Sequence, residues 1–261
     1  MSSSPQILIE QGVAHLTLNR PTQRNALDIP TLNAISAYLE DFAENPAVRV
    51  LLIDSVGKTF CAGADLAEWA AAEQRGELES YGWTEAAHQM MDQLYRLPKP
   101  TIAAIHGGAV GAGMDLALCC DMRIADKTAY FKAGYTSMAY CPDAGASWHL
   151  PRLIGEEQAK RLLFLDEPYN AEQAFAAGLI GEICADGELA TLAQERAARF
   201  AAGPTLAFAE TKTLIRDSYS RTLAEQLLAE QAAGLRCGRS QDAMEALNAI
   251  NEKRPPQFIG R

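Results

Sequence analysis

Residues 98–121 read PKPTIAAIHGGAVGAGMDLALCCD, and the rest of the chain is organised around them. Thr101 to Ile105 is a short apolar run rich in β-branched residues, which predicts a buried strand, and Met114 to Cys120 has helical character. Between them lie four glycines: Gly107, Gly108, Gly111 and Gly113. Glycines let the backbone approach a ligand closely, and the start of a helix presents bare N–H groups. The stretch therefore predicts an anion or oxyanion site, with Asp115 in the first helical turn.

Composition limits the classes of protein that need to be considered. The chain has 261 residues, of which 48% are hydrophobic, so it can bury a large core. Its net charge of −10 offers no basic field to nucleic acid or to an anionic membrane. No apolar run is long enough to cross a membrane and no secretion signal is visible, so we expect a soluble, cytoplasmic protein. The six cysteines lack metal-site spacing, which favours reduced thiols and no metal centre.

Hydrophobic periodicity predicts how the chain is organised. Strand and helix patterns alternate to about residue 184, and only helical patterns follow. This order indicates an α/β core in residues 1–200 with a helical region in residues 201–261. Strands are predicted at 6–10, 13–18, 48–53, 101–105, 122–125 and 129–132. Helices are predicted from Ile29 to Phe42 and at 66–72, 81–97, 114–120, 156–164, 171–177, 188–202, 204–219, 223–237 and 241–251, with a loop or frayed helix at 73–82 and a loop at 133–147.

Four motifs, in this order along the chain, resemble the crotonase family of enoyl-CoA hydratases and isomerases. They are FCAGADL (60–66), KPTIAAIHGGAVGAGMDLALCCDMRIA (99–125), PDAGASWHLPRLIG (142–155) and AFAAGLIGEI (174–183). The resemblance covers essentially the whole chain. It implies a spiral core of ββα turns, a helical C-terminal trimerisation region, and assembly as a homotrimer or hexamer. It also implies an acyl-CoA thioester as the substrate, with no cofactor.

The resemblance further implies an oxyanion hole made of two backbone N–H groups. These carry over to Ala62 in FCAG and to Ala112 in GAG, where the family commonly has glycine. The loop 62–65, comprising Ala62, Gly63, Ala64 and Asp65, is expected to contact the CoA thioester. Asp65 also precedes a predicted helix as an N-cap, and Arg24 is a candidate partner for the CoA phosphates.

The acid and base groups do not match a standard hydratase of this family. The two glutamates that such enzymes use correspond here to Asp115 and Tyr135. Asp143 lies in the loop Pro142-Asp143-Ala144-Gly145, which resembles the branch of phenylacetate-pathway isomerases with a lone catalytic aspartate. A similar position carries the nucleophilic aspartate of 4-chlorobenzoyl-CoA dehalogenases, which would also need an aromatic cage. Tyr135 and Trp148 are candidates for such a wall, or are core or pocket-lining residues.

Several functions remain open at this stage, and isomerisation is preferred. One base can take a proton from C2 and return it at C4 while an oxyanion hole holds the dienolate, so Asp143 alone suffices. A second possibility is hydration of a 2-enoyl-CoA by Asp115 and Asp143 around a water. Asp115 is otherwise a helix-start carboxylate satisfied by backbone N–H groups. A third is a non-catalytic acyl-CoA or RNA-binding relative, although the acidic composition argues against RNA.

Overall fold

The computed structural model describes residues 4–77 and 81–261, and a six-stranded sheet forms its centre. The strands are β1 (Gln6–Glu10), β2 (Val13–Leu18), β3 (Val50–Ser55), β4 (Thr101–Ile105), β5 (Gly108–Val110), β6 (Met122–Asp126), β7 (Tyr130–Lys132), β8 (Tyr169–Asn170) and β9 (Glu182–Cys184). The order in the main sheet is β1-β2-β3-β4-β6-β9. Only β1 and β2 pair antiparallel, as a hairpin around Gln11 and Gly12, and the other pairs are parallel.

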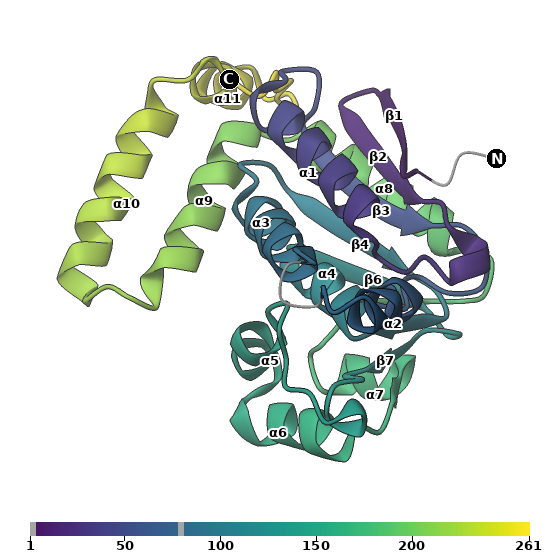
Figure 1. Cartoon of the computed structure of the whole chain (residues 1–261). Coiled ribbons are helices and arrows are strands. Elements are labelled where there is room, and N and C mark those ends of the chain that lie inside the picture. Colours follow the sequence, from purple (N-terminus) through teal and green to yellow (C-terminus); the bar gives the residue numbers. More distant parts are fainter. Residues whose placement is uncertain (1–3, 78–80) are drawn as a thin grey trace.

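Helices cover both faces of this sheet, which explains why the central strands are continuously apolar. The helices are α1 (Ile29–Glu44), α2 (Leu66–Gln74), α3 (Trp83–Arg96), α4 (Ala112–Cys119), α5 (Ala146–Ile154), α6 (Glu156–Leu165), α7 (Ala171–Ala176), α8 (Leu189–Ala201), α9 (Thr205–Ser218), α10 (Leu223–Gly238) and α11 (Gln241–Glu252), with short 3₁₀ helices η1 (Pro21–Gln23) and η3 (Thr136–Met138). In Figure 1, α1 and α3 lie in front of the sheet and α8 lies behind it. The larger core cluster fills the first interface and the smaller one fills the second.

The glycine-bearing stretch leaves the main sheet and enters a second, smaller one. Strand β5 pairs with β7, and β7 pairs with β8, so residues directly after β4 turn away from the central sheet. Gly107 has φ +57 at this turn, and a Cβ there would overlap the carbonyl of Lys58. Only glycine fits this close approach. The turn places β5 and the start of α4 against the loop that precedes α2.

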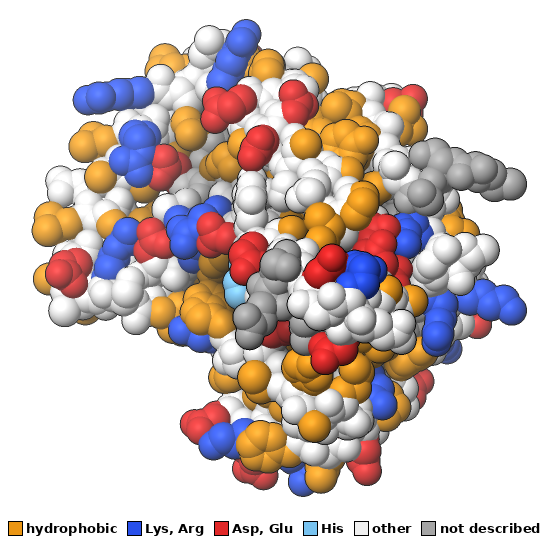
Figure 2. Space-filling view, viewed as in Figure 1, with side chains coloured by type: hydrophobic (Ala, Val, Ile, Leu, Met, Phe, Trp, Pro, Cys, Tyr) orange, Lys and Arg blue, Asp and Glu red, His pale blue; other side chains and the backbone are white. Residues whose placement is uncertain are grey.

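The three C-terminal helices extend to one side of the core. Figure 1 shows α9 and α10 as a pair that stands apart from the sheet, with α11 above them. Side-chain caps help to fix the ends of these helices. Thr222, for example, forms a capping box with Glu225 at the start of α10. Figure 2 shows hydrophobic side chains on this part of the surface. The exposed ones include Ile215, Leu223, Leu228, Leu235, Leu247 and Ile250.

Most predicted elements are found, with differences of one or two residues at their ends. One prediction is wrong. The loop predicted at 133–147 contains η3 and the start of α5, and α5 as a whole was not predicted because Pro151 reads as a helix break. The strand predicted at 48–53 begins at Val50. Part of the loop or frayed helix predicted at 73–82 lies outside the described residues, and α2 continues to Gln74.

Two predictions from composition can be compared with the structure. All six cysteines are free thiols, four of them buried, as expected for reduced core residues. Within residues 4–77 and 81–261, no helix combines the length and the apolar character that crossing a membrane would require.

Candidate active site

The loop before α2 and the glycine-bearing stretch pack directly on each other. The Cys61 amide donates to the Gly108 carbonyl at 3.0 Å, and the Val110 amide donates to the Cys61 carbonyl at the same distance. A Cβ at Gly113 would overlap the carbonyl of Cys61, so this contact requires glycine. Backbone pairing therefore fixes the position of one turn relative to the other.

The Ala62 amide is not available to a ligand. It donates to the carbonyl of Arg24 at 3.0 Å, which corrects its assignment as an oxyanion-hole donor. Ala64, two residues on, forms a parallel bridge with Leu27, in which Leu27 donates to the Gly63 carbonyl at 2.7 Å. The bridge uses the carbonyls and amides on either side of Ala64. Among the described residues, the Ala64 N–H has no acceptor in the protein.

The Ala112 amide is the second free donor. Ala112 is the first residue of α4, so its N–H has no partner within the helix, and none elsewhere in the described part of the chain. Gly63, with φ +90, lets the two turns lie close together, since it has no Cβ. A Cβ at this position would lie 3.2 Å from the Ala112 nitrogen. Ala64 and Ala112 line the same cavity of about 510 Å³. Two unpaired N–H groups in one pocket are suited to holding a carbonyl oxygen that gains negative charge.

Asp143 lies in the wall of this cavity, in the loop between η3 and α5. It is half-buried, and burial raises the pKa of its carboxyl above the ordinary value, while the His88 charge lowers this pKa. The His88 ring on α3 contacts the main-chain carbonyl of Asp143 through Nε2, at 2.6 Å, and as the donor it holds the loop in place. A carboxylate with a raised pKa beside an oxyanion site can act as a general base.

Asp115 lies behind the cavity wall. It is fully buried in α4, and it accepts a hydrogen bond on Oδ2 from the Tyr135 hydroxyl, while its Oδ1 has no hydrogen-bond partner within residues 4–77 and 81–261. Tyr135 lines the cavity and Asp115 does not. Burial raises the pKa of Asp115 to about 7, although the Tyr135 hydrogen bond opposes this change. The side-chain partner is thus the Tyr135 phenol and not an N–H group at the start of α4, and the backbone of Ala146 at the start of α5 also lowers this pKa.

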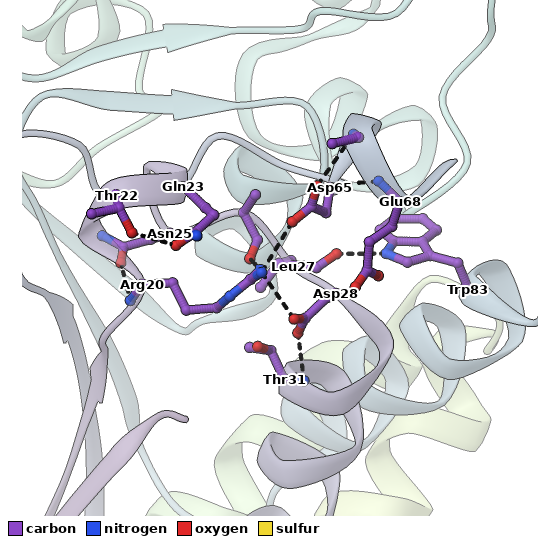
Figure 3. A network of polar contacts seen from close by, with 12 residues as sticks. Arg20, Thr22, Gln23, Asn25, Leu27, Asp28, Thr31, Asp65, Glu68 and Trp83 are labelled. Atoms are coloured by element: carbon purple, nitrogen blue, oxygen red, sulfur yellow. Dashed lines mark hydrogen bonds and ion pairs between the residues drawn. The ribbon is translucent and has the colours of Figure 1, made fainter. Parts of the chain in front are cut away.

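Asp65 has a structural role. Its side chain caps α2 by accepting from the Ala67 amide at 3.2 Å and from the Glu68 amide at 3.4 Å. Arg20 joins this cap to the cap of α1, because one guanidinium nitrogen lies 3.1 Å from Asp65 Oδ2 and 3.0 Å from Asp28 Oδ2 (Figure 3). Asp65 is buried and does not line the cavity, in contrast to Ala62, Gly63 and Ala64.

Two further predicted site residues lie away from the cavity. Trp148 is on α5, where it packs edge-on against Tyr95 at 5.1 Å and carries the Arg152 guanidinium over its ring. Trp148 therefore lies outside this cavity, which favours the alternative that it is a core or pocket-lining residue over that of an aromatic wall at the site. The Arg24 side chain is exposed beside the loop that its carbonyl holds, and it does not line the cavity. Its contact with CoA phosphates stays a prediction.

Some residues of the cavity were not predicted. Trp69 on α2, Trp83 at the start of α3, and Tyr140 after η3 form much of the wall. Trp83 falls on the apolar stripe of the helix predicted at 81–97, which by itself indicates a core residue. Nothing in the local sequence shows that these three rings meet, because they come from three separate segments.

Comparisons with known proteins agree with this geometry. The model of the enoyl-CoA hydratase/isomerase family matches residues 8–261. The chain is similar to the 1,2-epoxyphenylacetyl-CoA isomerase of Escherichia coli, at 34% identity over 97% of each protein. It is similar to a solved structure of a Pseudomonas aeruginosa protein, at 65% identity and a TM-score of 0.85 over 88% of this chain and 97% of that one. It also resembles an enoyl-CoA hydratase from Polaromonas sp. JS666, at 32% identity and a TM-score of 0.92 over 98% and 99% of the two chains. The fold, the site and the matched family model agree: the chain belongs to the enoyl-CoA hydratase/isomerase family.

Proposed function

We propose that the protein moves a carbon–carbon double bond in an enoyl-CoA thioester. The observation that carries this proposal is the position of Asp143, a half-buried carboxylate that lines the same cavity as the free amides of Ala64 and Ala112. Glu73 also reaches this cavity, but its side chain is exposed at the end of α2. Asp143 is therefore the better candidate for a base that works away from bulk water.

The chemistry needs one base and one oxyanion site. Asp143 takes the C2 proton of a 3-enoyl thioester, and the electrons of that C–H bond spread over C2, C3, C4 and the thioester oxygen. The two amides hold the negative charge on that oxygen, and a donor of this kind is worth on the order of 3 kcal/mol in the transition state. Asp143 then returns the proton at C4, which leaves the double bond between C2 and C3. The raised pKa of Asp143 suits both transfers.

The position of Asp115 favours isomerisation over hydration. A hydratase of this family type would hold a water between two carboxyl groups, and the candidates here are Asp115 and Asp143. Asp115 is fully buried and engaged by Tyr135, whose ring faces the cavity. A phenol that already donates its proton to Asp115 is a poor base for activating water, because burial and Asp115 raise the pKa of Tyr135.

Substrate absorbance tests the proposal directly. A 3-enoyl-CoA offered to the protein should give rising absorbance in the enoyl-thioester band, since the product is conjugated. A 2-enoyl-CoA would give falling absorbance if the protein hydrated it. A falling signal with the second substrate and none with the first would replace isomerisation by hydration, and no change with either would indicate a protein that only binds.

We also propose that CoA and neighbouring subunits contact the surfaces left open in the single chain. The exposed Arg24 side chain can pair with CoA phosphates beside the loop 62–64.

The apolar residues exposed on α9, α10 and α11 support assembly as a homotrimer or hexamer. Light scattering on the purified protein measures its mass, and Leu228→Lys on α10 should reduce the assembled fraction. The cytoplasmic location also stays a prediction, which cell fractionation tests.

A further inference from the structure

Three aromatic rings form one side of the active-site cavity. Trp69 and Trp83 have ring centroids 5.8 Å apart with planes tilted by 41°. Trp69 and Tyr140 lie 5.7 Å apart and meet edge to face at 71°. The chain has three tryptophans, and two of them line this cavity. This concentration of rings distinguishes the cavity from a plain aliphatic pocket.

The rings are held in place by the protein itself. Trp83 is almost fully buried, and its indole N–H donates to the Leu27 carbonyl at 2.7 Å (Figure 3). Leu27 is also the residue that bridges Ala64, so the backbone that positions the free amide also positions the indole. Trp69 packs on the fixed face of Trp83. A wall that is formed before the ligand arrives spends less binding free energy on ordering side chains.

Large apolar side chains lie exposed around the same cavity. Leu66, Met138 and Tyr140 line it and are 51%, 46% and 48% exposed. They come from α2, from η3 and from the residues that follow η3. Apolar side chains left open together around one cavity indicate a ligand that covers them. Methionine and aromatic side chains both make favourable contacts with an aromatic ring.

We propose that the acyl group of the substrate carries a planar ring, so that the protein acts on aryl-substituted or cyclic enoyl thioesters in preference to straight-chain ones. This inference depends on the proposed function for the thioester end, where the Ala64 and Ala112 amides and Asp143 act. The ring contacts Trp69 and Tyr140, and Trp83 supports Trp69 from behind. Each edge-to-face or offset contact with a ring tightens binding by about two- to tenfold beyond the effect of buried area, a gain that a flexible alkyl chain does not make.

Binding of unreactive thioesters tests the inference apart from catalysis. Competition of 3-phenylpropanoyl-CoA and hexanoyl-CoA for the wild-type protein, followed by tryptophan fluorescence, should give a dissociation constant about tenfold lower for the phenyl compound. Equal constants, or tighter binding of the straight chain, would overturn the proposal. Isomerisation of straight-chain 3-enoyl-CoA would then still support the proposed function.

Removal of one ring identifies the residues responsible. In Trp69→Leu the preference for the phenyl thioester should disappear, whereas hexanoyl-CoA should bind within about twofold of wild type. Trp148→Leu removes an indole outside the cavity and should keep the wild-type preference. Loss of the preference in both variants would sink the inference. A preference lost only in Trp69→Leu supports it even if no double bond moves, and in that case the proposed function fails by itself.

Discussion

The Tyr135 hydroxyl donates its hydrogen bond to Asp115, so that the phenol and not the carboxyl faces the active-site cavity. The resemblance to the hydratases of this family implies a pair of glutamates at these two positions. Here a shorter acid is enclosed in the protein and a phenol replaces the second acid. Asp115 is therefore a titratable group on α4 that is buried in the protein core, and its ionisation affects the stability of the fold.

Ionisation of Asp115 should make stability fall as the pH rises. Its folded pKa of about 7 exceeds the ordinary value of 3.8, so the folded state binds the proton more tightly between these values. The stabilisation is therefore present below about pH 4 and is lost as the pH rises to about 7. A difference of this size corresponds to roughly 4 kcal/mol at most. Asp115→Asn cannot ionise and keeps an acceptor for Tyr135, so it should not lose this stability.

Urea unfolding at pH 5 and pH 8, at one protein concentration, measures this effect. The stability of Asp115→Asn relative to wild type should be greater at pH 8 than at pH 5. An exposed carboxylate of α3 provides the control, and Asp92→Asn should leave the pH dependence unchanged. An identical pH dependence in wild type and Asp115→Asn would show that Asp115 does not ionise in this range.

Asp143→Asn should abolish isomerisation without loss of CoA binding. The amide keeps the size of the side chain but cannot accept the C2 proton, and removal of a general base costs about 10²–10⁴-fold in rate. The rise of enoyl-thioester absorbance measures kcat, and competition by a saturated acyl-CoA measures binding. Wild-type turnover by Asp143→Asn would refute the assignment of the base.

Gly63→Ala should impair activity far more than a matched glycine substitution elsewhere. Gly63 has φ +90, and a Cβ there would lie 2.7 Å from the Val110 carbonyl and 3.2 Å from the Ala112 nitrogen. The clash would force apart the two turns that carry the free amides. Gly187 has φ +85 with no atom near its Cβ position, so Gly187→Ala carries the backbone strain alone, about 1–3 kcal/mol. Equal kcat values in the two variants would contradict the convergence of the amides.

Arg20→Gln should destabilise the protein strongly. The guanidinium pairs with Asp28 and Asp65, all three side chains being 10–12% exposed, and its loss leaves both carboxylates without their cation. Breaking a buried pair in this way typically costs ~3–5 kcal/mol. Arg75→Gln breaks a pair with Glu77 in which both side chains are more than half exposed, and should change stability by less than about 1 kcal/mol. Thermal unfolding compares the two variants, and similar losses would show that the Arg20 pairs are not buried interactions.

Local patterns in the sequence predicted much of the fold. The hairpin of β1 and β2 and the strand β4 match their predicted residues, because alternation and short apolar runs are visible within a few residues. Helix α5 was missed where Pro151 conflicts with a helical pattern. In these cases the information is local, and tertiary packing changes only the ends of elements or overrides a single residue.

The site was predicted less completely, for a physical reason. The resemblance to family motifs indicated Asp143 and Ala112 as site residues, and both line the cavity. The choice of Ala62 over Ala64 was wrong because the direction of each amide depends on the bridge between Ala64 and Leu27, which are far apart in sequence. The wall made by Trp69, Trp83 and Tyr140 was missed for the same reason, since three separate segments form it.

Arg20 also links the N-terminal hairpin to the cavity. It follows β2 by two residues, and its guanidinium holds the start of α2, which carries Trp69. Any opening that frees the end of the hairpin must also loosen the cavity wall, so a thioester that binds the wall opposes that opening. Bound ligand should consequently slow amide hydrogen exchange in residues 13–18, the second strand of the hairpin, none of which lines the cavity.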